Sequence, residues 1–142
     1  MAKVQEIFDM AIHLMDEQSE SNGSTGTVDT QEYKFRTISI LNSIIPALQI
    51  YSSNYDREGF GRPEPEILLA NDHANPDFTQ EIALDNVLSY SLLPYYLAAQ
   101  LLSGENEELA AWFMNRYRET LNDVKNKMLA EFEDISRPYG LF

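Results

Sequence analysis

The stretch Asp85-Asn-Val-Leu-Ser-Tyr-Ser-Leu-Leu-Pro-Tyr-Tyr-Leu-Ala-Ala-Gln-Leu-Leu-Ser-Gly104 decides the fold of this chain. It predicts a helix over 85–103 that is apolar on nearly every side, and a helix of that kind must be covered by other elements. After the break at Ser103 and Gly104, residues 105–132 form a striped, amphipathic run that predicts a second helix. The short connection indicates that the two helices form an antiparallel hairpin. The rest of the chain is therefore expected to cover helix 85–103.

The side chains at the centre of this hairpin are predicted from their helical spacing. Pro94 lies inside helix 85–103 and is expected to bend it, because proline lacks a backbone N–H. Val87 and Arg116 are also placed on the stripes that face the core. The predicted core and motif residues are Leu92, Pro94, Tyr95, Leu97, Trp112, Phe113 and Tyr117.

Two further helices are predicted before the hairpin, over about 2–17 and 29–54. In the second of these, Asp29 and Glu32 have the spacing of a capping box, and Pro46 is expected to kink the helix. The first helix has a single apolar stripe, whose members recur at the i, i+3, i+4, i+7 spacing. They are Val4, Ile7, Phe8, Ala11, Leu14 and Met15.

The four helices predict an all-α fold in a single domain over 1–142, since a chain of 142 residues is long enough to bury one continuous core. Segment 18–28 is small and polar and is predicted to be an exposed loop. Segment 56–83 holds several glycines and prolines, so it is predicted to be irregular. Within it, 66–69 and 80–84 are candidate strands of a small β-hairpin. A loop of this length in a compact domain is more often functional or interfacial than decorative.

The last segment, 133–142, is predicted to be a tail that is unusually apolar at its end. Each of its large apolar side chains would contribute about 1.5–3 kcal/mol if fully buried. The tail either folds back onto the core of its own chain or docks on another subunit, and both alternatives stay open. The candidate interface residues are Ile135, Tyr139, Leu141 and Phe142, together with the 56–83 loop.

Composition narrows the classes of partner. The net charge of −13 argues against ordinary nucleic-acid binding, which requires basic residues to displace the counterions of the phosphates. The longest apolar run is far shorter than a bilayer span, and the first residues do not resemble a signal peptide. The protein is therefore expected to be soluble and cytoplasmic, with no membrane partner and no specific nucleic-acid partner.

No catalytic, cofactor-binding or metal-binding residue is predicted. The chain has no cysteine and only two histidines, and it contains no phosphate-binding glycine loop or nucleophile elbow. Asp9, His13 and Glu17 lie on one helix face, but a solvated polar face explains them better than a metal site. A second cluster, Asn71-Asp72-His73 with Asp77, is weak evidence for a metal site, because it offers few candidate ligands in a loop without a glycine-defined ligand pattern. The protein is not expected to be an enzyme, and an enzyme site in the 56–83 loop remains only as a distant alternative.

The second half of the chain resembles a known family. The residues that carry the resemblance are Leu84–Leu88, Leu92-Leu93-Pro94-Tyr95-Tyr96-Leu97-Ala98-Ala99-Gln100-Leu101-Leu102, Asn106–Ala110, Phe113, Arg116-Tyr117-Arg118-Glu119, Ala130–Ile135 and Tyr139-Gly140. This pattern is similar to that of small helical head–tail connector, or adaptor, proteins of tailed phages and prophages. The first half is similar only in architecture. Ser136-Arg137-Pro138 and the longer loop 18–28 depart from the family pattern.

The resemblance implies a virion structural protein that forms a ring of identical subunits at the portal exit. Its partners would be the portal and tail proteins, and its site the host cytoplasm during assembly and then the virion neck. Acidic surfaces suit such a ring, because duplex DNA must pass without adhering. No catalytic residue follows from the resemblance. The alternative is a small acidic regulatory module that mimics DNA and engages a basic protein, for which charge complementarity would provide the specificity.

Overall fold

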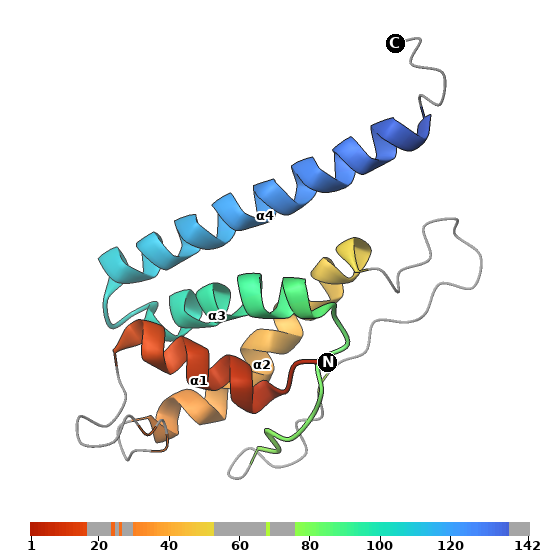
Figure 1. Cartoon of the computed structure of the whole chain (residues 1–142). Coiled ribbons are helices and arrows are strands. Elements are labelled where there is room, and N and C mark those ends of the chain that lie inside the picture. Colours follow the sequence, from red (N-terminus) through yellow and green to blue (C-terminus); the bar gives the residue numbers. More distant parts are fainter. Residues whose placement is uncertain (17–23, 25, 27–29, 53–67, 69–75, 137–142) are drawn as a thin grey trace.

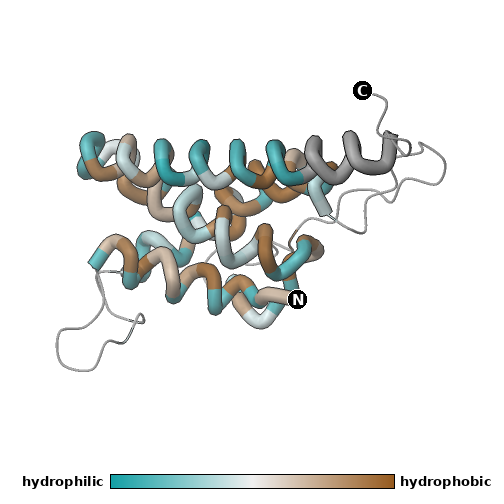
Figure 2. The backbone as a smooth tube through the Cα atoms, turned by 45° about the horizontal axis from the view of Figure 1, so that its top comes forward, coloured by the Kyte–Doolittle hydropathy of each residue, from teal (hydrophilic) through white to brown (hydrophobic). Residues whose placement is uncertain are grey.

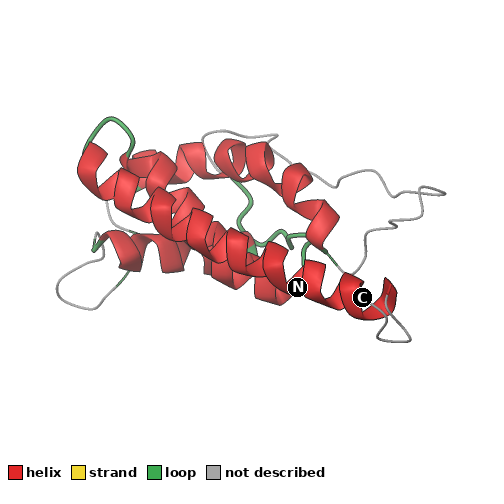
Figure 3. Cartoon of the chain, turned by 90° about the horizontal axis from the view of Figure 1, so that it is seen from above, coloured by secondary structure: helices red, strands yellow, loops and turns green. Residues whose placement is uncertain are grey.

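The computed structural model describes four α-helices and one 3₁₀ turn. They are α1 (Val4–Met15), α2 (Gln31–Leu48), the 3₁₀ turn η1 (Gln49–Tyr51), α3 (Asn86–Leu102) and α4 (Glu107–Ser136) (Figure 1). The described residues are 1–16, 24, 26, 30–52, 68 and 76–136, with the side chains of α4 described as far as Lys127. No strand occurs among them (Figure 3), which confirms the predicted all-α fold.

Helix α3 is the centre of the structure, as its sequence predicts. It packs against α1, α2 and α4, and its contact with the antiparallel α4 is the most extensive of these (Figure 1). Its buried side chains are distributed around the whole helix, and they include Ser89 as well as Leu92, Leu93, Pro94, Leu97 and Leu101. Among the predicted core residues, Leu92, Pro94, Leu97, Phe113 and Tyr117 are buried, and Tyr95 is half-buried.

Four side chains predicted to face the core lie at the surface instead. Trp112 is 53% exposed, Val87 is 70% exposed and Leu14 is 38% exposed, while Arg116 is also exposed. For Trp112 and Arg116 the physical reason is that α4 packs chiefly on α3, so only one side of α4 is covered. The buried residues on the inward side of α4 are Ala110, Phe113 and Tyr117, and Trp112 lies at the edge of this side. Figure 2 shows hydrophilic residues along the outward side of α4.

The α3–α4 turn depends on a left-handed glycine. Gly104 has φ +107°, a conformation that residues with a side chain rarely adopt, and it occupies the predicted position after the end of α3. The backbone N–H groups of Glu105 and Asn106 both donate to the carbonyl of Leu102, at 3.0 and 2.9 Å. These bonds delay the start of α4 to Glu107, two residues later than predicted.

Helix α4 also ends later than predicted. It continues through Ser136, so residues 133–136 belong to the helix and not to a tail. After Gly104, the next residue that interrupts helices is Pro138, which disfavours helical geometry in the residue before it. The sequence thus contains no stop signal at Phe132.

Segment 76–84, which holds the second predicted strand, is hydrogen-bonded to the N-terminal residues of the chain. The N–H groups of Val4 and Gln5, which have no partner within α1, donate to the carbonyls of Gln80 and Phe78, both at 3.0 Å. Ile82 donates to the carbonyl of Ala2 at 2.8 Å, and an isolated antiparallel bridge joins Lys3 to Glu81. The second strand of the predicted hairpin is therefore paired with the N-terminus.

The first predicted strand of that hairpin has one described residue, Leu68. Its backbone N–H and carbonyl both bond to the side-chain amide of Asn42 in α2, at 2.7 and 3.0 Å. A side chain thus provides the partners that a strand would have supplied. The remaining residues of 66–69 lie outside the described residues.

The structure tests the predicted N-cap of α3 but not that of α2. Thr30 precedes α2 as its N-cap residue, while the proposed cap Asp29 lies outside the described residues. Asp85 is the N-cap residue of α3 as predicted, but its carboxylate makes no cap bond and instead accepts from Ser52 Oγ at 3.2 Å. Pro46 and Pro94 both lie inside helices, α2 and α3 respectively.

Candidate interaction site

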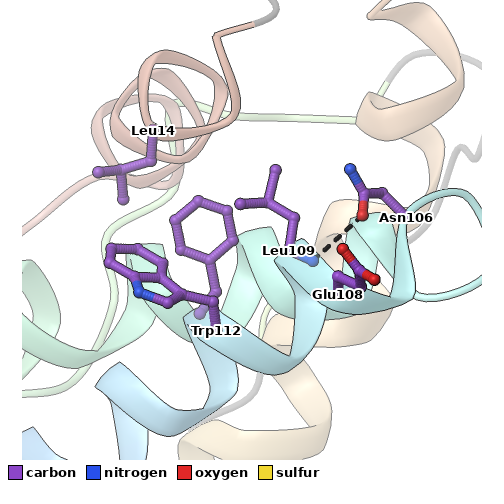
Figure 4. Close-up of a pocket in the computed structure, with 6 residues that line it drawn as sticks. Leu14, Asn106, Glu108, Leu109 and Trp112 are labelled. Atoms are coloured by element: carbon purple, nitrogen blue, oxygen red, sulfur yellow. Dashed lines mark hydrogen bonds between the residues drawn. The ribbon is translucent and has the colours of Figure 1, made fainter.

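An open apolar groove lies where α1 and α4 flank α3. It consists of two adjoining hollows of about 540 and 300 Å³ that share Leu14. The first is lined by Leu14, Asn106, Glu108, Leu109, Trp112 and Phe113, and the second by Met10, His13, Leu14, Tyr90, Pro94 and Tyr95. Figure 4 shows Leu14 of α1 facing Trp112 and Leu109 of α4 across the first hollow.

The groove exists because α1 and α4 each pack on α3 without packing closely on each other. Side chains that lie between α1 and α4 therefore remain partly exposed to solvent. Met10 is 37% exposed, Leu14 38% and Trp112 53%. Single exposed apolar residues are ordinary, but these three border one hollow region and form a small apolar patch.

Aromatic rings in contact with one another form one side of the groove. The Trp112 and Phe113 rings meet edge to face, with centroids 5.1 Å apart. Phe113 in turn lies 6.4 Å from the ring of Tyr95 on α3. Because Phe113 is buried and Tyr95 half-buried, Trp112 is held in place by the core while much of its own surface stays accessible.

Polar groups occupy the two ends of the groove. At one end, Asn106 Oδ1 accepts a hydrogen bond from the N–H of Leu109 at 3.1 Å, which caps α4 and fixes its first turn (Figure 4). At the other end, the Tyr90 hydroxyl donates to the carboxylate of Glu6. This bond raises the pKa of Tyr90, because the neutral phenol is the form that donates. The apolar middle is thus bounded by fixed polar groups.

A tyrosine cluster lies farther along the α3–α4 interface. The rings of Tyr96 and Tyr117 are 5.2 Å apart, and the hydroxyls of Tyr96 and Ser43 are hydrogen-bonded at 3.3 Å. Burial raises the pKa of Tyr117 to about 12, and the neighbouring Tyr96 and Tyr51 add to the shift. A phenol with a raised pKa remains neutral and acts here as a packing group.

Most of the residues that the sequence singled out for interfaces cannot be compared with this groove. Ile135 falls within α4, but its side chain lies outside the described residues, as do Tyr139, Leu141 and Phe142. Most of the 56–83 loop lies outside them as well. Of the predicted core set, Pro94, Tyr95, Trp112 and Phe113 line the groove.

The two possible metal clusters are only partly described. Asp9 accepts a hydrogen bond from Gln5 at 2.7 Å, while Glu17 lies outside the described residues. Asp77 accepts bonds from the side chain and backbone of Thr79, and these lower the pKa of its carboxyl group. Within the described part of the chain, no three His, Cys, Asp or Glu side chains come close enough together to hold a metal ion.

The sequence did not predict the groove. The available signal is an excess of apolar residues in the first helix, where Met10 lies beside the predicted stripe and Leu14, a predicted member of that stripe, is exposed. An exposed Trp on the hairpin helix would have been the second signal. Neither can be recognised without the distance between α1 and α4.

Comparisons of the chain with protein-family models, with curated proteins and with solved structures gave no match. Among the described helices, none combines the length and apolar character needed to cross a lipid bilayer. An open apolar groove with a few fixed polar groups is suited to binding an apolar segment of a protein.

Proposed function

We propose that this protein is a non-enzymatic structural subunit that assembles with copies of itself, as a head–tail connector of a tailed phage or prophage does. In this role it forms a ring at the portal exit during virion assembly and meets the portal and tail proteins. The observation that carries the proposal is the position of the Pro94-Tyr95 pair. These two residues are the most distinctive part of the resemblance, and they line the open groove.

Core packing alone does not call for a proline and a tyrosine at this point of α3. Leu92 and Leu93 just before them are fully buried, whereas the Tyr95 ring reaches the groove. A proline inside a helix leaves the carbonyl four residues earlier, that of Tyr90, without its usual partner. Such a costly residue is retained more readily where it shapes a surface that binds something.

The charge of the chain supports a ring around DNA. A net charge of −13 repels the phosphates of a duplex, so a channel lined by such subunits would let DNA pass without adhering. Exposed carboxylates include Glu105, Glu107 and Glu108 at the start of α4.

Electron microscopy of the purified full-length chain tests this proposal. The expected result is a closed ring with a central opening, because repeated head-to-tail contacts between identical subunits close into a ring when the rotation between neighbours permits. Particles without cyclic symmetry at concentrations where the chain self-associates would contradict the proposal.

The acidic charge also favours a second candidate function, the binding of a basic protein in the manner of a DNA mimic. Such a complex would weaken strongly with added salt, since exposed charges are screened within about 8–10 Å at moderate ionic strength. A monomeric chain that forms a salt-sensitive complex with a basic nucleic-acid-binding protein would support this function instead.

A further inference from the structure

We propose that the hollow beside Trp112 receives the segment Arg137-Pro-Tyr-Gly-Leu-Phe142 of a second copy of this chain. The inference rests on the proposed self-assembly and identifies the contact that produces it. It combines the apolar character of the hollow, the composition of the segment and the length of α4.

The hollow and the segment match in chemistry. Leu14, Leu109, Trp112 and Phe113 present apolar surface, and Glu108 is the sole carboxylate among the described residues that line the two hollows. Segment 137–142 contributes Tyr139, Leu141 and Phe142, and Arg137 is its only charged residue. In the proposed contact, three apolar side chains therefore meet an apolar surface, and the positive charge of Arg137 can pair with the carboxylate of Glu108.

The length of α4 excludes docking within the same chain. Ser136 lies about 35 Å along the helix axis from Phe113, at about 1.5 Å per residue. Fully extended, segment 137–142 spans at most about 22 Å. As long as α4 remains helical to Ser136, the segment cannot return to the hollow beside Trp112. A segment 137–142 that occupies the hollow must then belong to another copy.

The nearest segment of the same chain is a poorer occupant. Residues 17–29 follow directly after α1 and so begin next to Leu14, but Val28 is the only large apolar residue among them. A segment rich in serine, threonine and glycine gains little by covering an apolar surface. The C-terminal segment is the better match.

A contact of this kind joins two different parts of the chain, the groove of one subunit and the C-terminal segment of the next. Such heterologous contacts join subunits head to tail, and they close into a ring when the rotation between subunits permits. The straight, projecting α4 would act as the arm that carries the tail of one subunit to the groove of the next.

Trp112 provides a direct measurement, because it is the only tryptophan of the chain. The receptor is the full-length chain with Leu141→Ser and Phe142→Ser, in which the chain's own tail cannot compete. A synthetic peptide of residues 133–142 is titrated against it while Trp112 emission is recorded. We expect a saturable blue shift, and binding at least about tenfold weaker when the peptide carries the same two serines. No shift with the natural peptide would overturn the proposal.

A mixture of a groove variant and a tail variant tests whether the tail of one copy docks in the groove of another. Leu14→Glu blocks the groove of one chain, and the two serines disable the tail of the other. Each variant alone should fail to self-associate, whereas a mixture keeps one intact groove and one intact tail and should form a heterodimer. The control is Ile50→Glu, because Ile50 is 41% exposed and Leu14 is 38% exposed but Ile50 does not line the groove.

The outcomes also separate this inference from the proposed function. A full-length chain that assembles equally well with or without Leu14→Glu would overturn the groove contact and leave the structural role standing. A monomeric full-length chain whose disabled-tail variant still binds the natural peptide would support the contact and count against assembly of the isolated protein. Circular dichroism of each variant verifies that its helices are intact.

Discussion

The hydroxyl of Tyr33 donates a hydrogen bond of 2.6 Å to the carboxylate of Glu105, which follows it by 72 residues. The bond ties the first turn of α2 to the α3–α4 turn. Beside it, Arg36 Nη2 donates to the carbonyl of Leu101 at 3.1 Å, and its guanidinium lies 5.8 Å from the centre of the Tyr33 ring. This group of contacts fixes where α4 begins, and thereby where the hollow beside Trp112 opens.

Replacing Tyr33 by phenylalanine tests the importance of this tie. Tyr33 is buried, and the variant keeps the ring but removes the donor, so the free energy of unfolding should fall by about 1 kcal/mol. Urea denaturation followed by circular dichroism measures the change. Glu105→Gln retains an acceptor at the same position and should cost less than Tyr33→Phe. Equal stability of Tyr33→Phe and the parent chain would show that the bond contributes nothing.

Trp112 and Phe113 are adjacent but should respond very differently to truncation. Phe113 is 2% exposed, so Phe113→Ala should reduce the free energy of unfolding by about 3–5 kcal/mol. Trp112 is 53% exposed, so Trp112→Ala should cost less than half as much in an isolated protomer. Chemical denaturation of both variants at a concentration below self-association measures the difference. Similar losses would mean that Trp112 is a core residue after all.

Stability should fall at alkaline pH because of Tyr117. Its pKa is raised to about 12 in the folded state, whereas an exposed tyrosine has a pKa near 10. Between these two values the unfolded chain releases the proton and the folded chain retains it, so rising pH favours unfolding. The expected loss is about 1–2 kcal/mol.

The matched control for that prediction is Tyr117→Phe. Denaturation midpoints measured from pH 8 to pH 11.5 should decline less in this variant than in the parent chain. An identical decline in both would assign the effect to other groups.

Ser89 is a site where truncation should not destabilise. It is fully buried in α3, and its Oγ has no hydrogen-bond partner among the described residues. Because an unpartnered buried hydroxyl is costly and alanine favours helices, Ser89→Ala should leave the free energy of unfolding unchanged or raise it by about 1 kcal/mol. Thermal unfolding provides the measurement. A clear decrease would mean that the hydroxyl has a partner, such as a buried water.

The helical architecture could be predicted from the sequence because one element is apolar on all sides. Helix α3 must lie at the centre, and the Ser103-Gly104 break requires an antiparallel hairpin with α4. Both predictions are confirmed. The predicted start of α4 is two residues too early, because the spacing of apolar residues does not reveal the bonds from Glu105 and Asn106 to Leu102.

The candidate site could not be predicted, since it depends on spacing between helices. A periodic stripe identifies the side of α4 that faces inward but not how wide the neighbouring surface is. The spacing therefore predicts Trp112 as a core residue on the same basis as Phe113, although α1 leaves Trp112 uncovered. Segment 80–84 forms no strand in the structure, and its bonds could not be predicted from the sequence, because Gln80 accepts from the N–H of Val4 and Ile82 donates to the carbonyl of Ala2.

Light scattering on a size-exclusion column over a concentration series tests whether identical copies assemble through the groove beside Trp112, as we propose. The full-length chain and Ile50→Glu should form one discrete assembly of fixed copy number, and Leu14→Glu should elute as a monomer. A full-length chain that remains a monomer at every concentration, or a Leu14→Glu variant that assembles like the parent chain, would contradict the claim.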